Sequence, residues 1–196
     1  MKEETLEMEC VEVNSFEEQM LYMQKMTEMQ RTHNTLAKDI ETLVAIAKEQ
    51  ASDTDRIQPL IRACIKELFS LVEADLFLIN QFNPYPDYNE RDDLGRKFKK
   101  TYRHHAKTFK KQDIQKSYQS RFYGKFYTLK WKRDEFMHPK GRTSISVTTD
   151  DLANVNQVYE TYRKFVISLM TNVGVSIKIP IEQFLKGPLS FSNDFL

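Results

Sequence analysis

The residues best suited to catalysis in this chain lie together in the segment 133–139, which reads Arg-Asp-Glu-Phe-Met-His-Pro. The guanidinium group of Arg133 can hold a phosphate through a planar fork of hydrogen-bond donors. The imidazole of His138, five positions further on, can exchange a proton near neutral pH. Asp134, the polar residue after the arginine, can orient either partner. This combination of residue types is suited to phosphodiester chemistry.

The same string also has a purely structural interpretation. A histidine before a proline often ends a helix, where its cation is favoured by the helix dipole. An arginine beside Asp134 can form a surface ion pair that contributes little to stability. An arginine and a histidine at this spacing are a weak signal alone, whereas the complete string Arg-Asp-x-x-x-His-Pro is far rarer by chance.

The elements that must position these residues are predicted to be helices. Five glycines and six prolines in 196 residues favour long helices over strands and turns. Apolar residues recur at helical spacing, and polar caps or breaks separate the helical segments. We expect an all-α fold, an antiparallel bundle of four to five helices. The predicted helices cover residues 15–50, 55–81, 95–111, 112–137 and 150–172, with a possible short strand at 175–179.

Around this bundle we expect a flexible acidic tail over residues 1–14 and a C-terminal extension over residues 173–196, with one helical domain over residues 15–172. Residues 96–133 form a basic segment that leads into the motif. It holds fourteen Lys or Arg and one acid, Asp113. Such charge attracts nucleic acid, because cations neutralise phosphates and release counterions. The candidate RNA-binding residues are Arg121, Lys125, Lys130, Trp131, Lys132 and Lys140.

Nine aromatic residues are interleaved with these charges, and we expect about three quarters of them to lie in the core. The others could stack on unpaired bases. His104 and His105 are expected to be exposed bystanders. A basic middle and an acidic beginning could also simply compensate each other, because the net charge is only +1.

Composition excludes several other classes. Cys10 and Cys64 are isolated, which fits a reducing cytoplasm and neither a disulfide framework nor a metal site. The acidic N-terminus is unlike a signal peptide, and no apolar run reaches the roughly 20 residues of a membrane span. The sequence carries no glycine-rich phosphate loop and no metalloprotease motif. We therefore expect a cytoplasmic protein with no membrane association, no metal and no cofactor.

The helices and the motif together resemble the HEPN superfamily, small helical domains that often cleave RNA. In that family the string Arg-polar-x-x-x-His stands at the C-terminal end of the third main helix, where this chain has Arg133, Asp134 and His138. The family often carries an acid on the second helix that faces the same site. Glu73 is the natural candidate and Glu67 the substitute, although Glu73 could equally be an exposed helix charge.

The resemblance implies metal-independent endoribonuclease activity, in which the neighbouring 2′-hydroxyl attacks the phosphate and leaves a 2′,3′-cyclic end. His138 would act as general base or acid, and Arg133 would stabilise the phosphate charge. Asp134 or Glu73 would orient one of them. Five residues along a regular helix rotate by about 500°, so the side chains of Arg133 and His138 point about 140° apart. A homodimer with facing motifs solves this, as is usual in the family. Many members are toxins of toxin–antitoxin pairs or phage-defence effectors, so a cognate antitoxin is a possible partner.

Two other functions remain open. The chain could be a non-catalytic HEPN-like module that binds RNA, a nucleotide or a protein partner, with Arg133 and His138 only gripping phosphate. Alternatively, the long first helix could pair with a partner through its methionine stripe, which consists of Met20, Met23, Met26 and Met29.

Overall fold

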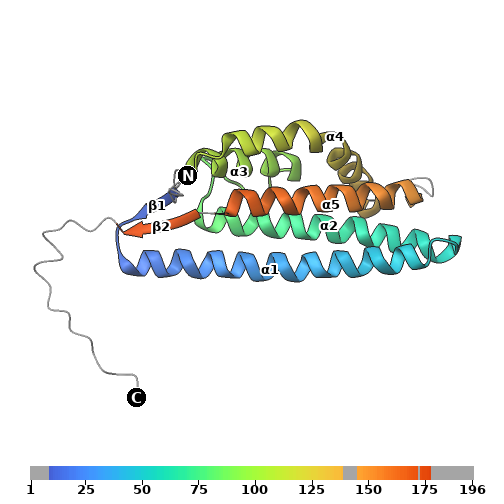
Figure 1. Ribbon diagram of the computed structural model, residues 1–196. Helices are drawn as coiled ribbons and strands as arrows, with labels where there is room; N and C mark the ends of the chain where they lie inside the picture. The colour runs from blue at the N-terminus through green and yellow to red at the C-terminus, as the bar shows by residue number, and fades with distance from the viewer. Residues whose placement is uncertain (1–8, 139–144, 172, 178–196) are drawn as a thin grey trace, which may run out of the picture.

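The fold is a bundle of long helices with one small pair of strands (Figure 1). The computed structural model describes residues 9–138, 145–171 and 173–177. Within these ranges there are five helices: α1 (Phe16–Glu49), α2 (Thr54–Phe82), α3 (Leu94–Thr108), α4 (Gln112–Met137) and α5 (Thr149–Met170). The all-helical bundle expected from the sequence is confirmed at this level. No helix in the described ranges is long and apolar enough to cross a membrane.

Helix ends fall where the sequence provides caps. The Ser15 hydroxyl accepts a hydrogen bond from the backbone N–H of Glu18 at 3.1 Å. The Glu18 carboxylate in turn accepts from the backbone N–H of Asn14 at 2.8 Å. Asp53 caps α2 by accepting from two backbone N–H groups, and Asp151 closes a capping box with Thr148 at the start of α5. Side chains thus satisfy donors that a helix start leaves without intrahelical partners.

The two strands are an addition to the predicted fold. Strand β1 (Glu9–Val13) pairs in parallel with β2 (Val173–Ile177), in a register that places Val11 opposite Val175. The expected loose tail over residues 1–14 therefore does not extend to residues 9–13. The physical reason is that β1 has a partner more than 150 residues away, which a local reading of the sequence does not provide. The strand expected at 175–179 is found two residues earlier, and residues 178–196 of the C-terminal extension lie outside the described residues.

The core is rich in aromatic rings contributed by the basic segment. Of its nine aromatic residues, six are buried, and Phe126 and Phe109 are completely so. Phe98 of α3 contacts Phe126 of α4, with ring centroids 4.6 Å apart. Tyr118 stacks on Phe165 of α5 at 3.8 Å. The predicted division of the aromatics, mostly core with a minority on the surface, is confirmed. These contacts fix α4, which carries the motif, against α3 and α5.

Candidate functional site

Arg133 is the centre of a cluster at the C-terminal end of α4. Its Nη2 lies 2.5 Å from Oε1 of Glu73 on α2, and its Nη1 lies 3.1 Å from Oδ1 of Asp134. The guanidinium carbon also lies 6.0 Å from the ring centroid of Phe69, within cation–π range. The structure therefore brings together three of the four predicted catalytic residues. Glu67, the substitute acid, is not among the partners of Arg133.

Lys130 extends the cluster to α3. Its ammonium group lies 2.9 Å from Asp134 and 3.0 Å from Asp93, the residue that caps α3. Burial lowers the pKa of Lys130, but hydrogen bonds and charges from the two carboxylates outweigh burial and leave the pKa raised. Burial raises the pKa of Asp93, and bonds from Lys130 and the Gly95 N–H outweigh it, so this pKa is lowered. Lys130 is thus a structural cation at the α3–α4 contact.

Lys132 has a similar structural role. It lies 2.5 Å from Asp151 Oδ2, the same oxygen that accepts the backbone N–H of Thr148 in the capping box of α5. This ion pair fastens the end of α4 to the beginning of α5. Lys130 and Lys132 were both predicted to bind RNA. In the structure their ammonium groups instead form ion pairs with carboxylates of the protein.

His138 stands apart from this cluster. Helix α4 remains regular through Met137, and His138 is its C-cap, with φ −133° and ψ 63°. The backbone N–H of His138 donates to the Asp134 carbonyl at 3.1 Å. The side chain is exposed, and within the described residues no hydrogen bond or ion pair joins it to Arg133 or to any other side chain. In one chain, therefore, carboxylates hold the side chain of Arg133, whereas the side chain of His138 is separate from them and exposed.

Of the other four predicted RNA-binding residues, three are exposed to solvent and one lies outside the described residues. Arg121 is exposed and lines a shallow groove between α4 and α5. Lys125 is exposed and donates to the Gln157 side chain. Trp131 is 63% exposed. Lys140 lies outside the described residues.

An aromatic row runs along α4 beside these cations. It consists of Tyr123, Tyr127 and Trp131, spaced four residues apart and therefore on one helix face. The rings of Tyr123 and Tyr127 are stacked, with centroids 5.4 Å apart. Tyr123 is half-buried, Tyr127 is 39% exposed, and Trp131 at the end of the row is the most exposed of the three. Flat, exposed rings in a basic setting can stack on unpaired bases.

The histidine prediction is wrong for His105, which is fully buried. Its ring packs against Phe109 at 4.6 Å, and its Nδ1 is 3.3 Å from the Asn83 side-chain amide. Burial, and secondarily the charges of Lys111 and His104, lower the pKa of His105 to about 3. The spacing of Phe98, Tyr102, His105 and Phe109, which follows one helix face, could have revealed this.

Sequence reasoning also missed a buried polar cluster between α1, α2 and α5. Asp75 is completely buried, and its Oδ2 lies 2.9 Å from Nδ1 of His33 and accepts from the Tyr162 hydroxyl at 2.8 Å. Tyr102 continues the cluster, with its hydroxyl 2.5 Å from that of Tyr162. Burial raises the pKa of Asp75, and the bonds from His33 and Tyr162 offset part of this. An acid and a histidine inside apolar helical stripes were the signal in the sequence.

No group of three or more His, Cys, Asp or Glu side chains within the described ranges is arranged to hold a metal ion. Comparison of the chain with known protein families, curated proteins and solved structures finds no match in any of the three.

Proposed function

We propose that the protein is a HEPN-like antiparallel bundle that cleaves RNA without a metal, through attack by the neighbouring 2′-hydroxyl. One observation carries the proposal: the acid predicted on the second helix, Glu73, reaches Arg133 on α4, while His138 remains exposed at the C-terminal end of α4. A carboxylate that holds a guanidinium fixes its direction, which is what a phosphate-binding arginine needs. An exposed histidine is available for proton transfer.

The site in one chain is incomplete, and a second copy would complete it. Within the described residues no side-chain bond joins Arg133 to His138, and the regular helix up to Met137 keeps their side chains on different faces. In a two-fold dimer with facing motifs, His138 of one protomer can meet Arg133 of its partner. A phosphate entering between them would compete with Glu73 and Asp134 for the guanidinium, because both carboxylates now occupy it. We therefore propose a composite site that assembles on homodimerisation.

The test of this function uses RNA in EDTA with the full chain. Wild-type protein should cleave the RNA, and His138→Ala should retain RNA affinity but lose cleavage by about 100-fold or more, the usual contribution of a general acid or base. His104→Ala is the matched control, because His104 is a partly exposed histidine outside the motif and should remain as active as wild type. Equal cleavage by wild type and His138→Ala would refute the role of His138.

Complementation tests the composite site separately. Arg133→Ala and His138→Ala should each be inactive alone. Mixed in equal amounts and allowed to exchange, half of the dimers would contain one intact site, so activity should return to about a quarter of wild type. If the mixture stays inactive although exchange is shown by subunit labelling, the two residues act within one protomer and the dimer proposal is wrong.

The aromatic row supports a second candidate, a non-catalytic RNA-binding module. Tyr127 and Trp131 expose their rings next to the motif, and Arg133 is already paired with two carboxylates. In this alternative, single-stranded RNA would bind with a strong salt dependence. No products would form, and Trp131→Ala would weaken binding more than His138→Ala.

A further inference from the structure

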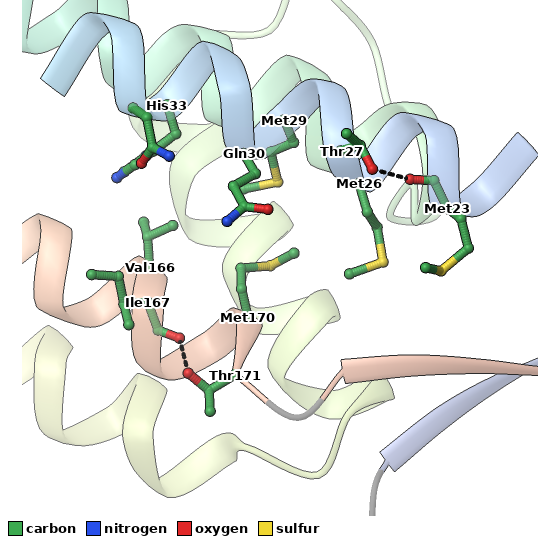
Figure 2. A pocket seen from close by; sticks show the side chains of 11 residues that line it. Met23, Met26, Thr27, Met29, Gln30, His33, Val166, Ile167, Met170 and Thr171 are labelled. Atoms are coloured by element: carbon green, nitrogen blue, oxygen red, sulfur yellow. Dashed lines mark hydrogen bonds between the residues drawn. The ribbon is translucent and has the colours of Figure 1, made fainter. Parts of the chain in front are cut away.

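The groove between α4 and α5 differs in charge from the groove on the other side of α5. The groove between α1 and α5 is lined mostly by methionines and polar side chains, and Figure 2 shows Met23 and Met26 extending from α1 toward α5. Its described lining includes no Lys or Arg. The α4–α5 groove has a volume of about 500 Å³ and is lined by Arg121 of α4 and Lys164 of α5. Only this second groove has the charge to attract an anion.

Arg121 is an exception among the cations along the contact between α4 and α5. Near the end of α4, Lys132 forms an ion pair with a carboxylate of α5. Two turns earlier, Lys125 donates a hydrogen bond to a side-chain amide of α5. One further turn back, Arg121 shares the groove with Lys164, so that α5 presents a second cation there instead of an acceptor.

The two groove cations are available to a ligand. Both are exposed, and within the described residues neither Arg121 nor Lys164 forms an ion pair or a hydrogen bond. Glu160, one turn before Lys164, does not line the groove. Asp113 does line it, but its carboxylate is fully exposed and lies 4.0 Å from the ammonium group of Lys116. Because like charges repel, an anion between the two cations would be favoured.

The other lining residues favour a sugar–phosphate backbone over a base. Ser117 of α4 and Ser168 of α5 are exposed on the walls of the groove, and such hydroxyls donate to phosphate oxygens. The lining also includes Tyr118 and Phe165, which are buried and stacked on each other with ring centroids 3.8 Å apart. Rings that are already stacked and buried leave no free face for a base.

An open row on α4 connects the groove with the motif. Arg121, Gly124, Thr128 and Trp131 follow one another at intervals of three or four residues and therefore share one helix face. Gly124 is exposed, and a β-carbon there would meet no atom within 4 Å. Thr128 is exposed as well. A strand could therefore run from the groove to the Trp131 ring without crossing a large side chain.

We propose that the α4–α5 groove binds the phosphate backbone of single-stranded RNA between Arg121 and Lys164. The inference rests on the proposed function, because it takes RNA as the ligand, and it adds the path of the strand along α4 to Trp131. The groove lies about 25 Å before His138 along the helix. The guanidinium and the ammonium group hold phosphate from opposite walls. The groove thus extends the length of RNA that the protein holds and takes no part in cleavage.

The test measures RNA binding in the full-length His138→Ala protein, in which the RNA stays intact under the proposed function. The probe is a labelled oligouridylate of about 15 nucleotides, titrated at several salt concentrations. In Arg121→Gln with Lys164→Gln, one or two phosphates lose their cation. The slope of log affinity against log salt should therefore fall by about 0.7 to 1.4. If this term vanishes at 1 M salt, affinity at 0.15 M should fall by about 4- to 14-fold.

Two further variants separate the groove from net charge and from folding. Lys38→Gln with Lys48→Gln removes the same charge from two exposed positions on α1 and should leave the slope nearly unchanged. Arg121→Lys with Lys164→Arg keeps both charges in the groove and should retain the wild-type slope. Because the groove cations are exposed and have no partner within the described residues, thermal unfolding should be the same in all of these proteins.

The outcomes distinguish this proposal from the nuclease proposal. Equal slopes in the groove variant and the α1 control, or no RNA binding at all, would overturn the groove and say nothing against the role of His138 in cleavage. Groove-dependent binding by a wild type that never cleaves RNA would support the groove and refute the nuclease. Uridine monophosphate tests the other source of phosphate. If it binds as tightly as the oligonucleotide and depends equally on Arg121 and Lys164, the groove holds a free nucleotide and the proposed strand path is wrong.

Discussion

Acid should destabilise this protein through His105, and the size of the effect follows from the burial of that residue. His105 is fully buried and its pKa in the folded chain is about 3, against 6.5 for the ordinary group. In the unfolded chain His105 is therefore protonated below about pH 6.5, whereas in the folded chain it stays neutral down to about pH 3. Stability is complete above the unfolded pKa and is lost as the pH falls through this window.

The magnitude can be worked out from these two values. Between pH 7 and about pH 4.5 His105 of the unfolded state becomes almost fully protonated, which lowers the free energy of unfolding by ~2.5 kcal/mol. At pH 4.5 the folded group is still neutral, so almost the whole effect of protonating the unfolded chain appears in the unfolding free energy. The effect amounts to a large part of the ~5–15 kcal/mol that stabilises a typical domain.

The assay is urea unfolding at both pH values for wild type and His105→Leu. All other titrating groups, including Asp75, are common to both proteins and cancel in the difference. The wild type should lose ~2.5 kcal/mol more than the variant between pH 7 and pH 4.5. The same pH dependence in both proteins would refute the burial of a neutral His105, whatever the absolute stability of the variant.

Three further predictions concern the core and the candidate site. Phe126→Ala should cost about 3–5 kcal/mol of unfolding free energy, because a fully buried ring is removed; a loss below about 1 kcal/mol in thermal or urea unfolding would contradict the core assignment. A double-mutant cycle of Glu73→Gln and Arg133→Gln should give a coupling of about 0.2–1 kcal/mol, since the pair is partly exposed, and a coupling indistinguishable from zero would contradict a stabilising contact between the two side chains. Trp131→Ala should weaken single-stranded RNA binding by about 1–3 kcal/mol without changing stability; unchanged affinity in a filter-binding titration would exclude the aromatic row as a platform.

The helices could be predicted because their signals are local. The motif helix, α4, begins and ends at the predicted residues, and α1 and α5 begin within one residue of the predicted positions 15 and 150. Periodicity, caps and breaks all lie within a few residues of the structure they determine. A short strand near β2 was expected from the sequence, but its pairing with β1 could not be predicted, because the pairing joins segments at opposite ends of the chain.

The contact between Glu73 and Arg133 could be anticipated from the sequence, but the pairing of the neighbouring charges could not. Glu73 was chosen because the HEPN resemblance implies an acid on the second helix, and its carboxylate does contact Arg133. Lys130 and Lys132 were predicted to face RNA, yet carboxylates from α3 and α5 hold them. Charge counts along a segment describe what is available, but tertiary contacts decide which charges remain for a ligand. The hydrogen bond between His33 and Asp75 is another contact between residues far apart in the sequence.

The most direct test of the central claim is the chemistry of the RNA ends. RNA incubated with wild-type protein in EDTA should yield fragments that mass spectrometry identifies as 2′,3′-cyclic phosphates, and these fragments should be absent with His138→Ala. Such products would show metal-independent attack by the 2′-hydroxyl that depends on the motif. RNA left intact by the wild type, or cyclic ends that form equally well with His138→Ala, would contradict the proposed nuclease.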